Sequence, residues 1–164
     1  MIELIKKLEA CKEFKEYCRD NKDIFLAHFF YMDDEPNKDI VQIGYYNKKT
    51  EMIVTFMVEK DKVTKNPEEK VFKEQQEVIM PLEMSKVKID VEQAFEIADN
   101  FQKKKYPEQK PVKRVAILQH LPLGQVWNIT YISNSFNTLN IKIDSEKKKI
   151  ISDKLISLLG KTIS

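Results

Sequence analysis

Apolar and polar residues alternate along two neighbouring stretches of the chain, residues 126–132 and 139–144. Such alternation places the apolar side chains on one face of a strand and the polar side chains on the other. The polar segment between them, Ser133 to Thr138, predicts the turn of a hairpin. An earlier hairpin is predicted from Ile40 to Val58, with its turn at Asn47 to Thr50.

Four further segments have the composition of strands. Ile24 to Met32 reads IFLAHFFYM, which is short and rich in aromatic side chains, so we expect a strand buried on both faces or nearly so. Val112 to Gln119 predicts another strand, and Val78 to Met80 and Ile150-Ile151 predict short ones. Gly44 lies inside a predicted strand, where glycine marks either a bulge or a group that packs closely on the backbone.

Helical spacing of apolar residues appears three times. Met1 to Arg19 predicts one amphipathic helix. A second helix is predicted to begin at Asp90, which forms a capping box with Gln93, and to end at the lysines before Pro107. Ser152 to Gly160 predicts a short C-terminal helix that ends at its glycine.

The order helix, strand, hairpin occurs twice along the chain. An offset of 86 residues aligns Ile43 with Ile129 and Ile53 with Leu139, although a chance likeness of two such units is the alternative. We therefore predict an α+β protein of two α-β-β-β units, residues 1–86 and 87–164, in one compact structure. Helices would pack on an antiparallel sheet, followed by the short C-terminal helix.

The second half resembles a PepSY-type domain over about residues 88–152. The likeness rests on DVEQAFEIADNF from Asp90, on the alternating VWNITYI, and on LNIKIDSEKKKII from Leu139. The family has Thr-Gly in the last turn, where this chain has Lys147 and Lys148, and we expect a different turn because lysine tolerates positive φ poorly. The resemblance implies the fold and a non-catalytic binding role, with no cofactor.

Charge and composition exclude some classes of protein. Charged residues make up 33% of the chain, but 28 basic and 26 acidic residues leave a net charge of only +2. Proteins dedicated to nucleic acids or membrane surfaces usually carry a one-sided basic charge, so the near balance argues against a nucleic-acid role, and no membrane role is expected. No export signal is visible at the N-terminus, and the cytoplasm is the predicted compartment.

Candidate catalytic residues are few. Cys11 and Cys18 lie seven residues apart on a predicted helix, about 10.5 Å along its axis, which is too far for a disulfide. Buried, inert thiols are the simplest interpretation, and a nucleophile paired with His28 is the alternative. His28 and His120 are 92 positions apart and could meet only through the fold. We expect no enzyme and no metal site.

Charged clusters have simple local explanations. Asp33 to Glu35 could bind a hard cation, but the loop lacks the spacing of a calcium site, and a solvated turn is the simpler interpretation. Lys103 to Lys105 and Lys147 to Lys149 could contact phosphates, with Tyr106 as a stacking partner. A helix end and a turn explain the two lysine runs equally well.

A partner-binding surface is predicted on the C-terminal hairpin. Its polar face and turn supply uncharged groups and one aromatic side chain, which would anchor a partner if exposed or close the core if tucked under the sheet. The candidate residues are Asn128, Thr130, Asn134, Phe136, Asn137 and Asn140.

These features predict a non-catalytic intracellular binding or regulatory module. Its partner would be a protein, bound by pairing with a sheet edge or in an apolar groove between helix and sheet. The protein itself would be a monomer or a homodimer. The alternative is a carrier of a small or lipid-like ligand in an apolar cavity between helices and sheet.

Overall fold

The computed structural model describes residues 1–71 and 78–157 of the chain. The α-helices are α1 (Ile2–Ala10), α2 (Lys12–Asp20) and α3 (Val91–Lys105), and a 3-10 helix spans Met84–Lys86. The strands are β1 (Ile24–Asp33), β2 (Val41–Asn47), β3 (Met52–Val58), β4 (Val63–Lys65), β5 (Glu69–Lys70), β6 (Pro111–Leu121), β7 (Gly124–Ser133), β8 (Asn137–Asp144) and β9 (Ile150–Ser157).

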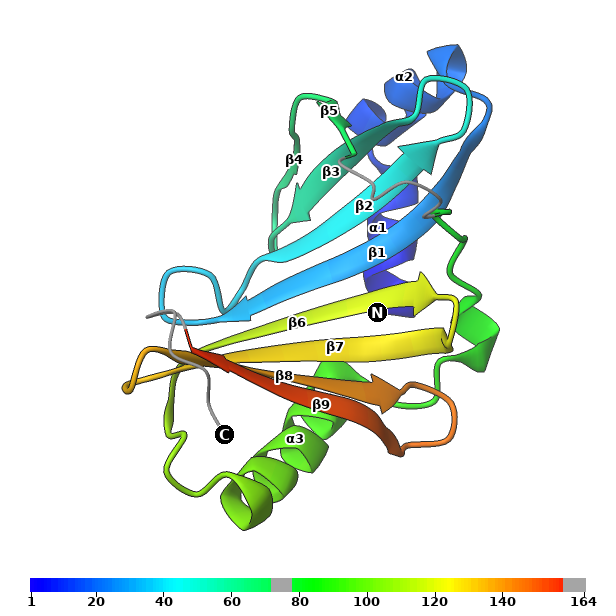
Figure 1. Ribbon diagram of the computed structural model, residues 1–164. Coiled ribbons are helices and arrows are strands. Elements are labelled where there is room, and N and C mark those ends of the chain that lie inside the picture. Colours follow the sequence, from blue (N-terminus) through cyan, green and yellow to red (C-terminus); the bar gives the residue numbers. More distant parts are fainter. Residues whose placement is uncertain (72–77, 158–164) are drawn as a thin grey trace.

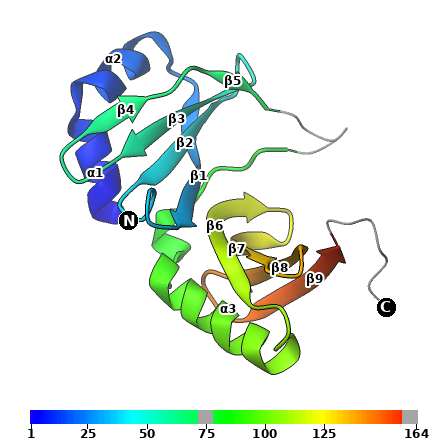
Figure 2. The same cartoon turned by 90° about the vertical axis from the view of Figure 1, so that its left-hand side faces the viewer.

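All the strands belong to one antiparallel sheet with the order β4-β3-β2-β1-β6-β7-β8-β9, and β5 pairs beside β4 on β3. The α-helices lie on the same side of this sheet (Figures 1 and 2). α1 and α2 pack against the first strands and α3 against β7 and β8. The other side, which we call the helix-free face, carries no α-helix in the described part of the chain. The predicted α+β class, with helices packed on an antiparallel sheet, is confirmed.

The two halves meet at the centre of the sheet, where β1 pairs with β6 and Phe30 lies opposite Ile117. On each side of this seam three consecutive strands form an antiparallel meander. Residues at corresponding places in the first, second and third strands are Phe29 and Ala116, Ile43 and Ile129, and Phe56 and Ile141. Their numbers differ by 87, 86 and 85 (116 minus 29, 129 minus 43, 141 minus 56).

The predicted offset of 86 is therefore correct for the second strands and wrong for the third. It aligns Ile53 with Leu139, but Leu139 is buried under the helices, whereas Ile53 alternates with the buried Val54 and points to the helix-free face. The physical reason is that each connection between these strands is one residue longer in the first half. One residue of slip moves a side chain to the other face of a strand.

The predicted N-terminal helix is in fact two helices. Cys11 is extended (φ −74°, ψ 157°) and ends α1. It also begins α2, because its Sγ accepts a hydrogen bond from the backbone N–H of Phe14 at 3.4 Å. The break lets Leu8 and Phe14 both enter the core. Helical spacing could not reveal it, because Cys11 itself continues the apolar stripe.

The predicted C-terminal helix, residues 152–160, is wrong in its described part. Those residues belong to β9, and positions 158–160 lie outside the described residues. The edge of β8 offers backbone groups along its whole length, and pairing with them outweighs the helical spacing of the leucines. Asp153 of β9 also accepts hydrogen bonds from Lys105 Nζ (2.8 Å) and the Tyr106 hydroxyl (2.6 Å) at the end of α3.

The remaining strand and helix predictions are confirmed with one exception. Val78 to Met80 forms no strand, although the N–H of Leu82 just beyond donates to the carbonyl of Leu26 at 2.9 Å. The predicted capping box is present. Asp90 Oδ1 accepts from the Gln93 N–H (2.9 Å) and Gln93 Oε1 accepts from the Asp90 N–H (3.2 Å).

Gly44 leaves room for the side chain of His28. It lies opposite His28 across β1 and β2, and a Cβ atom at Gly44 would come within 2.1 Å of His28 Cε1. Of the two explanations predicted for this glycine, close packing on the backbone is confirmed. The bulge lies on the neighbouring strand instead, where the register shifts between Leu26 and His28.

The turn between β8 and β9 contains a residue in the left-handed conformation that is not a glycine. Lys148 has φ 60°, at the place where the PepSY family has its glycine, so the expectation that the lysine changes this conformation is wrong. Such a conformation costs a non-glycine residue roughly 1 kcal/mol. The turn is held by Asp144 Oδ1, which accepts from the N–H groups of Glu146 (2.9 Å) and Lys147 (2.8 Å).

A glycine at position 148 should therefore stabilise the protein. We expect Lys148→Gly to raise the free energy of unfolding by roughly 0.5 kcal/mol, since part of the relieved strain is offset by the greater freedom of glycine in the unfolded chain. Urea denaturation measures it. Lys147→Gly is the control, because Lys147 has no positive φ, and it should not stabilise. Equal effects of the two changes would contradict the interpretation.

Candidate functional site

The helix-free face has an apolar centre formed by both halves of the chain. Phe30 and Met32 of β1 alternate with the buried Phe29, so they point away from the helices. They pair with Ile117 and Val115 of β6. All four side chains are partly exposed, and none belongs to the core under the helices. We call these four residues the apolar centre.

Uncharged polar side chains follow beside it on β7 and β8. Asn140 Nδ2 donates to Asn128 Oδ1 (2.6 Å) and to the hydroxyl of Thr130 (3.0 Å). Asn128 lies opposite Ile117 and Thr130 opposite Val115, so this amide ladder is the immediate neighbour of the apolar centre. The structure thus brings together three of the six predicted partner-binding residues.

The other three predicted residues lie apart from the ladder, in the turn between β7 and β8. Asn137 Nδ2 donates to Gln109 Oε1 at 3.0 Å, and Asn134 is exposed. Phe136 is 62% exposed and has φ 56°. The interpretation that Phe136 tucks under the sheet is therefore wrong, because the left-handed residue at this tight turn points its ring into solvent.

Three lysines lie around the ladder and the apolar centre on the helix-free face. Lys142 and Lys154 follow Asn128 and Asn140 across the sheet, and Lys113 lies opposite Ile132. Lys142 donates to Asn140 Oδ1 at 3.2 Å. Within the described residues, none of the three lysines pairs with a carboxylate. Their charge is therefore available to a partner.

Sequence reasoning found the ladder but missed the apolar centre. Residues 24–32 were expected to be buried on both faces, which leaves no surface to recognise. The structure buries Phe29 but leaves Phe30 and Met32 on the helix-free face. Phe30 and Met32 are two residues apart, as are Val115 and Ile117, so each pair was predictable on one face of its own strand. Only the pairing of β1 with β6 joins the two pairs.

A cavity of about 700 Å³ lies farther along the helix-free face, where β1 and β6 meet the segment that follows Val78. His28 and Gln119, which are paired across the two strands, both line it. Burial lowers the pKa of His28 to about 4, so its ring is neutral at pH 7. His120 also lines the cavity, with Nδ1 at 2.8 Å from the carbonyl of Pro81. The fold therefore does bring both histidines to one place.

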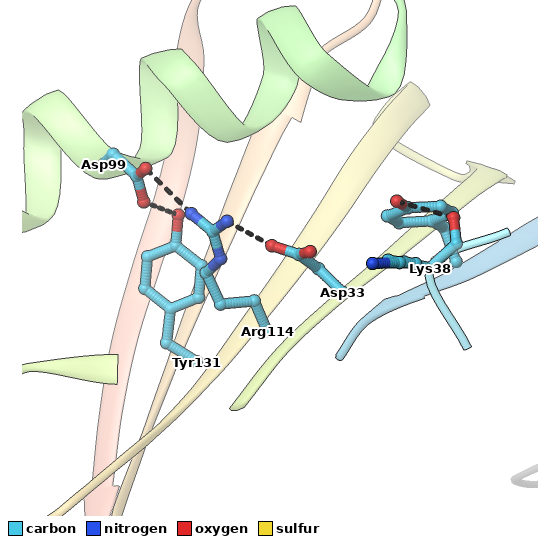
Figure 3. A network of polar contacts seen from close by, with 6 residues as sticks. Asp33, Lys38, Asp99, Arg114 and Tyr131 are labelled. Carbon is cyan, nitrogen blue, oxygen red and sulfur yellow. Dashed lines mark hydrogen bonds and ion pairs between the residues drawn. The ribbon is translucent and has the colours of Figure 1, made fainter. Parts of the chain in front are cut away.

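A polar network joins the two halves on the helix side (Figure 3). The guanidinium of Arg114 on β6 bonds to Asp33 on β1, and its Nη1 lies 3.0 Å from Asp99 Oδ2 on α3. The Tyr131 hydroxyl donates to the other oxygen of Asp99. Burial and this acidic partner raise the pKa of Tyr131, which stays protonated. Arg114 also stacks over Phe95, 5.0 Å from the ring centroid.

The candidate catalytic residues lie on different faces of the sheet. Cys11 and Cys18 are unpaired thiols on the helices, whereas His28 lies on the other face of the sheet. Burial raises the pKa of Cys18, which opposes formation of a thiolate. The described residues contain no cluster of three or more side chains that could hold a metal ion.

The acidic turn is held by local contacts, and one lysine of each run forms an ion pair, Lys105 with Asp153 and Lys147 with Asp144. Asp34 Oδ1 accepts from the Asn37 N–H at 3.1 Å, and Glu35 pairs with Lys38 at 2.9 Å. Among the described helices, none is long and apolar enough to cross a membrane.

Comparison with known proteins supports the fold only. No family model matches the sequence, and no curated protein matches it. One solved structure is similar, that of a candidate lipoprotein from Clostridium difficile 630, with a TM-score of 0.57 and 16% sequence identity. The match covers 88% of this chain and 90% of that one. At this identity the similarity concerns the arrangement of helices and strands.

Proposed function

We propose that the protein is a non-catalytic binding module that docks a protein partner on the helix-free face of its sheet. The observation that carries the proposal is the apolar centre, Phe30, Met32, Val115 and Ile117, bordered by the amide ladder. An apolar middle with a polar rim is the usual anatomy of a protein interface. The wet face of an ordinary antiparallel sheet would instead carry polar side chains throughout.

The partner is expected to present an apolar patch bordered by carboxylates. Lys142 and Lys154 lie on the ladder side of the apolar centre, and Lys113 lies beside Val115 on β6. No described carboxylate pairs with these three lysines. Complementary charge would set the orientation of the partner and accelerate association, and salt would weaken both effects. The apolar centre would supply most of the affinity.

We also propose that the chain is a tandem of two PepSY-like α-β-β-β units. In support, helices precede a meander in each half, and the two meanders meet with Phe30 opposite Ile117, which occupy corresponding places. Each unit alone would be marginally stable, whereas the pairing of β1 with β6 makes one sheet and one core.

The proposal extends to compartment and assembly. We propose a cytoplasmic protein, because unpaired thiols such as Cys11 and Cys18 suit a reducing compartment. The protein would be a monomer or a homodimer before it binds its partner, and it would need no cofactor.

The central experiment captures proteins from native lysate on the full chain. It compares two variants, each of which introduces one carboxylate at the surface. Ile117→Asp should reduce capture of a specific partner from native lysate at least tenfold, because it places a charge in the middle of the apolar centre. Ile2→Asp is the control, since Ile2 is 57% exposed on α1, away from the helix-free face, and it should have no effect. Quantitative mass spectrometry of the captured proteins measures both.

A charge reversal tests the expected chemistry of the partner. Lys142→Glu should weaken binding of the same captured protein, and added salt should reduce the difference from the wild type. If Ile117→Asp and Ile2→Asp affect every captured protein equally, the docking face is wrong. If Lys142→Glu strengthens binding, the expected acidic rim of the partner is wrong.

A further inference from the structure

The cavity of about 700 Å³ has the size of a small-molecule site, because such sites usually measure 300–1,000 Å³. It lies on the helix-free side of the sheet, whereas the predicted carrier cavity was between helices and sheet. Ile53 of β3 and the segment Val78, Ile79 and Met80 provide apolar lining. Apolar walls of this kind favour a ligand with a mainly apolar body.

His28 is a partly buried polar side chain on the wall of the cavity. Its ring rests on Gly44 and forms no hydrogen bond with any residue that the structure describes. Gln119, which is paired with His28 on the adjacent strand, brings an amide to the same cavity. An unpartnered imidazole and an amide that line one cavity can both hydrogen-bond to a ligand there.

The charges around the cavity favour an uncharged ligand. The neutral imidazole of His28 offers one donor and one acceptor, and the Gln119 amide offers both kinds of group. Glu69 and Lys70 also line the cavity with opposite charges. An ionic head group would lose its water without gaining a single dominant counter-charge. His120 has one ring nitrogen occupied by the Pro81 carbonyl.

We propose that this cavity binds a small, uncharged, mainly apolar molecule that carries one hydroxyl or amide group, which bonds to His28 and Gln119. This site shares no residue with the apolar centre, which begins two residues farther along β1 and β6, and the proposal does not depend on the docking of a protein there. The glycine at position 44 is then explained as part of the site, because any larger residue would displace the imidazole.

The test uses three naphthalene probes that differ only in their polar group. The full chain is titrated with 2-naphthol, with naphthalene and with naphthalene-2-sulfonate while the histidine Cε1–H signals are followed by NMR. The chain contains two histidines, so the signal that disappears in His28→Phe identifies His28. We expect 2-naphthol to shift the His28 signal saturably and to bind more tightly than either of the other probes.

Two variants separate the site from nonspecific binding. His28→Phe keeps an aromatic ring on Gly44 but removes both nitrogens, so 2-naphthol should bind about tenfold more weakly while naphthalene changes by less than about threefold. Ile53→Trp should abolish binding by filling the cavity. Val112→Trp is its control, because Val112 is 68% exposed and does not line the cavity.

Four results would overturn the proposal. One is the absence of a saturable shift of the His28 signal up to the solubility limit of 2-naphthol. Another is tighter binding of naphthalene-2-sulfonate than of 2-naphthol, which would mean that the site prefers an anion. The third is an equal effect of Ile53→Trp and Val112→Trp on the affinity for 2-naphthol. The fourth is an equal loss of affinity for 2-naphthol and naphthalene in His28→Phe.

Discussion

Lowering the pH from 7 to 4 is expected to remove about 3 kcal/mol of unfolding free energy through His28 alone. Burial lowers the pKa of His28 to about 4, whereas an exposed histidine in the unfolded chain has a pKa of about 6.5. Between these values the unfolded state takes up a proton that the folded state does not. Stability is therefore unaffected by this group above about pH 6.5, falls towards pH 4, and changes little below it.

The surroundings of His28 explain the direction of this effect. Its ring lies against the backbone of Gly44 and faces the cavity, which Ile53 and Met80 also line. The charged groups Glu69 and Lys70 of β5 and the ring of His120 line the same cavity. Burial is the cause of the lowered pKa, since a protonated imidazole there would lose its water without gaining a partner.

Urea denaturation between pH 7 and pH 4 tests the prediction on the wild type and His28→Phe. Carboxylates also titrate over this range, so the quantity to measure is the difference between the two proteins. We expect the wild type to lose about 3 kcal/mol more than the variant. Equal losses would show that His28 is not buried as described. NMR titration of the two histidine signals should independently place one pKa near 4.

Replacing Arg114 by methionine is expected to lower the free energy of unfolding by about 2 kcal/mol. Arg114 lies between Asp33 and Asp99, and its loss leaves two neighbouring carboxylates without their counter-charge. A fully buried pair broken in this way costs 3–5 kcal/mol. The side chains of Arg114, Asp33 and Asp99 are 33%, 29% and 28% exposed, so water reduces the cost.

The control is Lys105→Met, which breaks a single lysine–carboxylate pair with Asp153 at the exposed end of α3. Exposed pairs contribute little, so this variant should unfold close to the wild-type urea midpoint. The double variant Arg114→Met, Asp33→Asn should recover part of the loss, because one of the unpaired carboxylates is removed. The network does not hold the halves together if Arg114→Met is as stable as Lys105→Met.

The local features of the sequence were sufficient for most strands and for α3. Alternation within 126–132 and 139–144 reflects the pleat of each strand, and it needs no knowledge of the partner strand. The capping box of Asp90 and Gln93 is equally local, because both hydrogen bonds lie within one turn. The resemblance to PepSY-type domains rests on these same local patterns.

The candidate site was predictable only where its residues lie on one hairpin. Asn128, Thr130 and Asn140 follow from the alternation of one hairpin, and the structure joins them by hydrogen bonds. Phe30 and Ile117 are far apart in sequence, yet they lie opposite each other across β1 and β6. Their contribution to one surface depends on which strands are neighbours and which face the helices cover.

The sequence by itself determined that the chain is an α+β protein whose strands bury one face, because those patterns depend on neighbours along the chain. Only the tertiary structure decided that residues 150–157 form a strand, since the open edge of β8 offered backbone partners that a helix would have left unpaired. It also decided that His28, Gly44 and Gln119 meet beside a cavity. Strand pairing joins residues far apart in sequence, and alternation within one strand carries no information about its partner.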